Sequence, residues 1–121
     1  MTATVKTSNE KILEVMKKRD EILASNKSGI DILCEIFKNW QETDIFQSSG
    51  KLKYFYGLLQ EFTNNVPEKD EELIISSKKV VKYWEKNKDK IRGADYHLYY
   101  ALLAFADELK AKGLYFQILS Q

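Results

Sequence analysis

The stretch YHLYYALLAFADELKAKG, residues Tyr96 to Gly113, is the most apolar long segment of this chain. At 100° per residue of α-helix, its largest aliphatic and aromatic side chains form one stripe: Leu98, Leu102, Phe105 and Leu109. Its neighbours widen that stripe to more than half of the circumference: Tyr99, Ala101, Leu103 and Ala106. A helix of this kind is covered from several sides, so we predict a central helix. Gly113 stands where a glycine in the left-handed conformation would end it.

The composition is typical of one soluble globular domain. The chain has 121 residues, of which 44% are hydrophobic and 31% are charged. Its single cysteine, Cys34, excludes an internal disulfide and any multi-cysteine metal site. Residues 1–8 lack the apolar core of a signal peptide, and no window is apolar enough to span a membrane, so we expect a cytoplasmic protein.

Helical periodicity predicts two helices before residue 43. The first runs from a cap at Thr7 to about Ala24, with an apolar edge made of Ile12, Leu13, Met16 and Leu23. The second is capped by Ser28, and one face carries Ile30, Leu33, Cys34, Phe37 and Trp40. On that face Cys34 is expected to be a small buried side chain and not a reactive thiol.

Two more helices are predicted between residues 48 and 91. The third is capped by Ser48 or Ser49, and its buried face carries Leu52, Phe55, Tyr56, Leu59 and Phe62. The fourth is expected from Glu68 to Lys88 with Pro67 at its first position, where a missing N–H costs little. Its apolar face carries Leu73, Ser77, Val80, Val81, Trp84 and Ile91.

Together these segments predict an all-α fold: a single-domain antiparallel bundle of four to five helices spanning residues 1–121. Residues 1–7 are expected to be flexible. Residues 114–121 form an apolar tail that either packs back on the bundle or meets another subunit.

The first candidate for function is a basic face on the fourth helix. Five lysines project within about 120° of one another, opposite the apolar face: Lys78, Lys79, Lys82, Lys86 and Lys90. Lys51, Lys53 and Arg92 are expected near one end of the same surface. Since the net charge is only +1, any nucleic-acid partner requires such a local patch, which would follow phosphates without reading bases. The ordinary alternative is a solvated helix face.

The second candidate is aromatic. Tyr54 lies off the apolar stripe of the third helix, and Tyr96 and Tyr100 lie beside His97 on the narrow free face of the central helix. Asp107 and Glu108 complete that free face. Exposed aromatic rings beside lysines suit base stacking or a protein interface, whereas the ordinary alternative is a tyrosine that covers the edge of the core.

The third candidate is the pair Arg92 and His97, whose spacing resembles the R-x4-H element of the helical ribonuclease family known as HEPN. That resemblance implies an arginine and a histidine that activate the ribose hydroxyl of RNA. No other catalytic pattern is present: the sequence lacks a phosphate-binding glycine loop, a nucleophile paired with histidine at a known spacing, and a cluster of metal ligands. We therefore expect no cofactor and no metal, and a protein that is not an enzyme.

Two further stretches resemble the small helical subunit of type III CRISPR effector complexes. The first is the serine pair with the basic and aromatic element that follows it, from Ser48-Ser49-Gly50-Lys51-Leu52-Lys53 through to Phe62. The second is Tyr100-Ala101-Leu102-Leu103-Ala104-Phe105, which is similar to the last helix of those subunits. The resemblance covers about a quarter of the chain. It implies a non-catalytic subunit in antiviral defence that stacks in copies along guide and target RNA, with Lys51 and Lys53 at the backbone.

Three hypotheses follow. The leading one is a non-catalytic subunit of a larger assembly that contacts RNA backbone through a fixed set of lysines: Lys51, Lys53, Lys78, Lys79, Lys82 and Lys86. The second is a protein-interaction bundle, such as an immunity, adaptor or viral accessory protein, that uses the Tyr96 and Tyr100 face or the tail from Leu114 to Leu119. The third is the ribonuclease. Protein partners are expected in the first two, and neither a membrane nor a small-molecule substrate is indicated.

Overall fold

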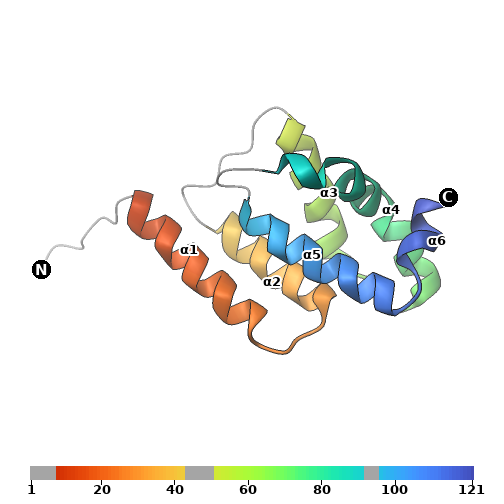
Figure 1. The fold of residues 1–121 in the computed structure, drawn as a ribbon, viewed down its shortest axis with the longest axis horizontal. Helices are drawn as coiled ribbons and strands as arrows, with labels where there is room; N and C mark the ends of the chain where they lie inside the picture. Colours follow the sequence, from red (N-terminus) through yellow and green to blue (C-terminus); the bar gives the residue numbers. More distant parts are fainter. Residues whose placement is uncertain (1–7, 43–50, 92–95) are drawn as a thin grey trace, which may run out of the picture.

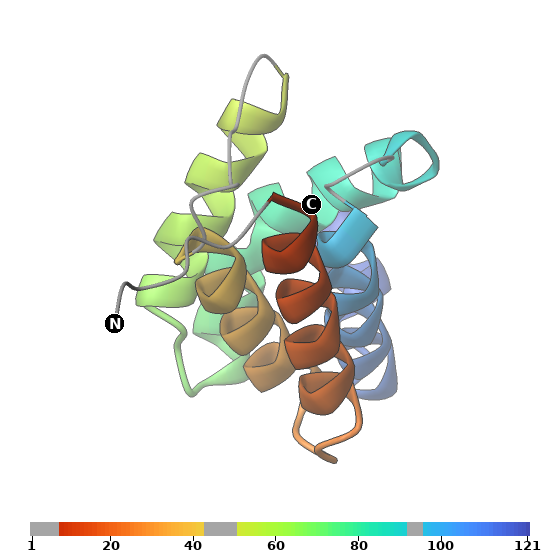
Figure 2. The ribbon, with the colours of Figure 1, turned by 90° about the vertical axis from the view of Figure 1, so that its left-hand side faces the viewer.

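The computed structural model describes residues 8–42, 51–91 and 96–121, which form six α-helices and one short 3-10 turn. In chain order they are α1 (Ser8–Leu23), α2 (Gly29–Gln41), α3 (Lys51–Asn64), α4 (Asp70–Asn87), η1 (Lys88–Lys90), α5 (Tyr96–Ala111) and α6 (Tyr115–Leu119). In both views α1, α2 and α5 lie side by side, whereas α3 and α4 form the other end of the molecule (Figures 1 and 2). The predicted all-α fold is confirmed.

Helix α5 is the centre of this arrangement, as its apolar stripe predicts. The side chains of Leu98, Leu102 and Leu109 are almost completely buried. Each other helix is in contact with it, through Arg19–Tyr100 (α1), Gly29–Ala104 (α2), Phe62–Phe105 (α3), Trp84–Tyr99 (α4) and Lys110–Tyr115 (α6). One continuous core therefore joins all six helices of the described ranges.

The end of α5 also matches the sequence. Gly113 has a φ of 75°, and its N–H donates to the carbonyl oxygen of Lys110. The next N–H, of Leu114, donates to the carbonyl oxygen of Leu109, which completes a Schellman motif. This turn sends the chain back, and α6 buries Tyr115 and Ile118 against the core beside α4. Of the two alternatives for the tail, packing back on the bundle is observed.

Helices α2 and α5 approach each other unusually closely where α2 begins. Gly29 is buried there, and a Cβ at this position would overlap the carbonyl oxygen of Ala104 and lie 2.7 Å from its carbonyl carbon. The free N–H groups of this helix end are satisfied from two sides. Ser28 accepts from the Asp31 N–H at 3.2 Å, which confirms the predicted cap, and Glu108 of α5 accepts from the Ile30 N–H at 3.1 Å.

The predicted apolar edge of the first helix is wrong at two positions, because Leu13 is 64% exposed and Met16 is also exposed, whereas Leu23 is partly buried against the core. Among the described side chains of α1, the buried ones are Val15 and Ile22. Between them Arg19 covers the core, with only 12% of its side chain exposed and its guanidinium 5.2 Å from the ring centre of Tyr100. A long charged side chain can occupy an apolar stripe in this way because its aliphatic stem packs while its head remains polar.

Three other expectations need correction. Pro67 is not at the first position of the fourth helix, because α4 begins at Asp70 with Lys69 as its N-cap. Leu103, placed on the apolar side of α5, is exposed, because that side is narrower than the sequence suggests. The supposedly free face of α5 is partly covered: Tyr100 is half-buried beneath Arg19, and Glu108 is held by α2. The apolar face of α4 is confirmed from Leu73 to Trp84, together with Ile91.

Candidate nucleic-acid interface

Helices α3 and α4 run antiparallel and meet through aromatic rings. Tyr83 of α4 stacks on the buried Phe55 of α3, with ring centres 4.4 Å apart and an angle of 14° between the ring planes. The ring of Tyr54 also lies near Tyr83, with ring centres 6.2 Å apart and an angle of 49° between the ring planes. Rings of this size hold the two helices apart, because the distance between packed helices depends on the side chains at the contact.

An open depression lies along this seam, and lysines dominate its lining. We call it the lysine groove. It is lined by Tyr54, Lys79, Lys82, Tyr83, Lys86, Asn87 and Lys90. Because α4 rises about 1.5 Å per residue, Lys79, Lys82 and Lys86 follow one another at intervals of about 4.5 to 6 Å along the helix axis. Lys90, in η1, continues the row beyond the end of α4.

The acidic residues of α4 and η1 do not line the lysine groove. Glu85 accepts hydrogen bonds from the Tyr115 hydroxyl and the Lys88 ammonium group, on the side of α4 that meets α6. These bonds lower the pKa of Glu85, so the carboxylate stays charged and occupied there. The described side chains that line the groove therefore carry positive charge and no negative charge.

One lysine of the groove has an internal partner. The ammonium group of Lys82 donates a hydrogen bond to the backbone carbonyl oxygen of Gln121, just after α6. Lys79, Lys82, Lys86 and Lys90 are all exposed at the surface. Because the ammonium group of Lys82 is exposed and its side chain is flexible, it can turn from this oxygen to a phosphate.

A second depression continues along the seam from Lys79, which lines both. Its other lining residues are Leu58, Glu61, Phe62, Asn65, Ile75, Ser76, Lys78 and Val80. Lys78 is half-buried here, with Glu61 on the same lining, and Ile75 is 74% exposed. Lys78 therefore belongs to this adjoining depression and not to the lysine groove.

Among the other predicted phosphate-binding residues, the structure describes Lys53, which is not part of the lysine groove. Lys53 is exposed on α3, one residue before Tyr54, but it lines neither depression. The side chain of Lys51 lies outside the described part of the structure, as do Arg92, the cap candidates Thr7, Ser48 and Ser49, and residues 1–7.

Of the predicted aromatic candidates, only some can be placed, and those that can be placed lie in different parts of the molecule. Tyr54 is 61% exposed and lies in the lysine groove. Tyr100 is half-buried between Arg19 and Tyr99, so it is part of the contact between α1 and α5. The side chains of Tyr96 and His97 are not described. Sequence reasoning missed Tyr83 and Asn87, which belong to the groove because α3 packs beside them.

The remaining chemistry is sparse. Burial, with help from Asp31 and Glu35, raises the pKa of the Cys34 thiol to about 11, so the half-buried sulfur is protonated at neutral pH. Within the described residues, no three histidine, cysteine or acidic side chains gather as a metal site. In the same part of the chain, no helix is long and apolar enough to cross a membrane.

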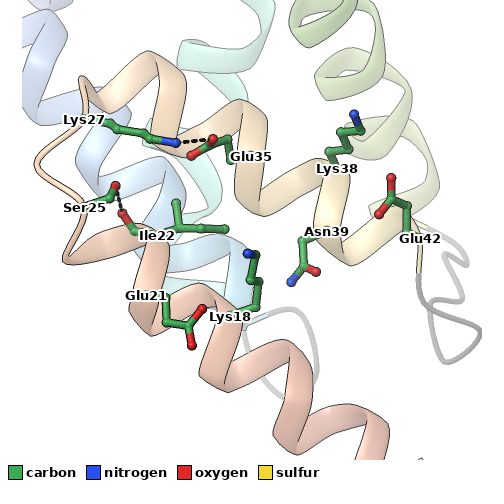
Figure 3. A pocket seen from close by; sticks show the side chains of 9 residues that line it. All are labelled: Lys18, Glu21, Ile22, Ser25, Lys27, Glu35, Lys38, Asn39 and Glu42. Atoms are coloured by element: carbon green, nitrogen blue, oxygen red, sulfur yellow. Dashed lines mark hydrogen bonds and ion pairs between the residues drawn. The ribbon is translucent and has the colours of Figure 1, made fainter.

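A polar cleft between α1 and α2 differs from the lysine groove in charge (Figure 3). Its lining mixes three lysines with three glutamates: Lys18, Lys27, Lys38, Glu21, Glu35 and Glu42. Lys27 and Glu35 form an ion pair, and two other atoms, Glu35 Oε2 and Asn39 Nδ2, are buried without a hydrogen-bond partner. Because those two atoms are inaccessible and the lining charges balance, this cleft offers no comparable site for an anion.

No protein-family model matches the chain, and comparisons with curated proteins and with solved structures also gave no significant match. The class that can be stated is therefore an all-α helical bundle with a lysine-lined groove between its third and fourth helices.

Proposed function

We propose that this protein is a non-catalytic subunit that binds the backbone of RNA through the lysine groove, within a larger ribonucleoprotein assembly. The observation that carries the proposal is the gathering of Lys79, Lys82, Lys86 and Lys90 in one depression whose described lining contains no carboxylate. Most lysine-rich helix faces are interleaved with acids, as in the cleft between α1 and α2. The resemblance to the small subunit of type III CRISPR complexes supports the choice of RNA and of an assembly.

The spacing of these lysines fits a polyanion better than a single phosphate. They are spread along α4 and η1 and do not converge on one point, so each can neutralise a different phosphate. Such contacts position a strand without reading its sequence. The affinity of one isolated copy is expected to be modest, and neighbouring copies in an assembly would raise it by acting together on one strand.

The test is a fluorescence anisotropy titration of labelled single-stranded RNA with the full chain at low salt. Replacing Lys79, Lys86 and Lys90 together by alanine should weaken binding by at least tenfold, because about three phosphate contacts are lost. The matched control replaces Lys17, Lys38 and Lys69, three exposed lysines outside the groove, and changes the net charge equally. Equal losses in the two triple variants, or no binding by the native chain, would contradict the proposal.

A DNA strand of the same sequence is the second arm of this titration. Because the lysines are offered to phosphates, we expect DNA to bind with similar affinity. RNA bound much more tightly than DNA would point to a contact with the 2′-hydroxyl group in addition.

The alternative is a protein-interaction bundle, and one observation favours it. Ile75 is largely exposed and lies beside Leu58 in the adjoining depression, where an apolar side chain of a partner could insert. Of the surfaces first considered for this role, the tail buries Leu114, Tyr115 and Ile118, although Phe116 is exposed. Absence of RNA binding by the native chain at low salt would shift the assignment to this alternative.

The ribonuclease hypothesis is not carried forward as a proposal. Arg92 and the side chain of His97 lie outside the described residues, so no geometry of that pair supports it.

A further inference from the structure

We infer that Tyr54 is a stacking platform for a nucleobase, which makes the lysine groove selective for single-stranded nucleic acid of any sequence. The inference rests on the proposed function and deepens it, because it names the form of the strand that the same groove would accept.

The first support is the position of Tyr54 at the end of a series of aromatic rings. Phe55 is buried, Tyr83 is stacked on it and half-buried, and Tyr54 is beside Tyr83 and 61% exposed. The contact with Tyr83 braces one part of the Tyr54 ring, while most of the side chain faces solvent. A braced and exposed ring loses little conformational entropy when another flat ring is laid against it.

The second support is the charge around that ring. Tyr54 lines the same depression as Lys79, Lys82, Lys86 and Lys90. A strand whose phosphates lie along the lysines would carry its bases on short flexible links beside the tyrosine. Positively charged grooves combined with aromatic side chains are the usual way in which proteins bind single strands without sequence preference.

The selectivity follows from the state of the bases. In a duplex the bases are paired and stacked on one another, so their faces are closed to a side chain at the surface. In a single strand every base has an accessible face, and stacking on tyrosine tolerates any base. Lysines alone do not make this distinction, because they contact phosphates that both forms present.

The other exposed aromatic side chain of the described residues is a natural control. Phe116 on α6 is 68% exposed, but it does not line the lysine groove. Its removal changes an exposed aromatic surface of similar size while leaving the lysine row intact.

The experiment compares three labelled RNA probes with the full chain at one salt concentration: a single strand, an abasic strand of equal length, and a blunt duplex with an equal number of phosphates. The single strand should bind roughly tenfold more tightly than the other two, as expected for one stacked base. Tyr54→Ala should remove this difference without changing the affinity for the abasic strand. Tyr54→Trp should keep the difference, and Phe116→Ala should leave all three affinities unchanged.

Failure of this inference is distinguishable from failure of the proposed function. If the abasic strand or the duplex binds as tightly as the single strand, or if Tyr54→Ala lowers all three affinities equally, the stacking role is overturned while phosphate binding stands. If none of the three probes binds at low salt, the proposed function fails and the stacking role fails with it.

Discussion

The pair α2–α5 and the pair α3–α4 are both packed through helix faces, but their contact residues differ in size. The first pair meets through small residues, with Gly29 against the backbone of Ala104. The second meets through the stacked rings of Phe55 and Tyr83. Small residues let two backbones approach closely, whereas aromatic rings hold the helices apart, and two depressions lie along the seam between α3 and α4. The same packing rule therefore accounts for the close contact between α2 and α5 and for the open seam between α3 and α4.

The strongest test of the close pair is Gly29→Ala. The added Cβ would overlap the carbonyl oxygen of Ala104, and neither backbone can move without disturbing the start of α2. We expect the free energy of unfolding to fall by about 3 kcal/mol, at the upper end of overpacking effects. Urea denaturation followed by circular dichroism measures the change. A loss below about 0.5 kcal/mol would show that α2 and α5 are not held at this distance.

Glu108→Ala should have a smaller effect on the same contact. It leaves the N–H of Ile30, part-buried, without its acceptor, and it removes a negative charge from the N-terminus of α2. We expect a loss of about 1 to 2 kcal/mol in the same urea experiment. Asp107, the exposed residue just before Glu108, provides the control: Asp107→Ala should change stability by less than about 0.5 kcal/mol.

On the side that faces α6, helix α4 is held by the hydrogen bond between Tyr115 and Glu85. Tyr115→Phe tests this contact. The substitution removes the hydrogen bond from the Tyr115 hydroxyl to Glu85, which should cost about 1 kcal/mol at pH 7. The pKa of Glu85 is lowered in the folded state, first by this bond and then by Lys88. Its contribution is therefore complete above the pKa of the unfolded state and is lost as the pH falls through the lower folded value.

The measurement is urea denaturation of the native chain and of Tyr115→Phe at pH 7 and in acid. The cost of the substitution should shrink in acid, and in a Glu85→Gln background it should no longer depend on pH. A cost that is the same at both pH values in the native background would show that the tyrosine does not act through the charged carboxylate.

The smallest expected effect is a gain. Gly57 lies in the middle of α3, exposed, and a Cβ there would meet no atom within 4 Å. Since glycine is a poor helix former, Gly57→Ala should raise the free energy of unfolding by about 0.5 to 1 kcal/mol. The same glycine-to-alanine substitution should therefore lower the free energy of unfolding in the pair α2–α5 and raise it in the pair α3–α4. Destabilisation at position 57 would indicate a neighbour that the packing of α3 does not show.

The sequence predicts most of the fold because long apolar stripes are strong signals. The faces of α4 and α5, the cap at Ser28 and the end of α5 at Gly113 all follow from local patterns. The edge of α1 does not, because Arg19 takes a place on the core that a count of apolar residues gives to Leu13 or Met16.

The sequence predicts those residues of the lysine groove that lie on a single helix, but not those that helix packing brings to it. The row Lys79, Lys82, Lys86 can be read directly from helical spacing on α4. The assignment of Tyr54 to the same groove, and of Lys53 to neither depression, depends on how α3 turns against α4. That rotation is set by the contact between Phe55 and Tyr83, which are 28 positions apart in the printed sequence and have no local signal that pairs them.

The most direct measurement is the salt dependence of RNA binding by the native chain. If four lysines of the groove each neutralise one phosphate, a plot of log K against log salt concentration should have a slope of about −3, and Lys86→Ala should make it shallower by about 0.7. Lys17→Ala, outside the groove, should leave the slope unchanged. A slope near zero, or equal slopes for the native chain and Lys86→Ala, would contradict binding of RNA backbone in the lysine groove.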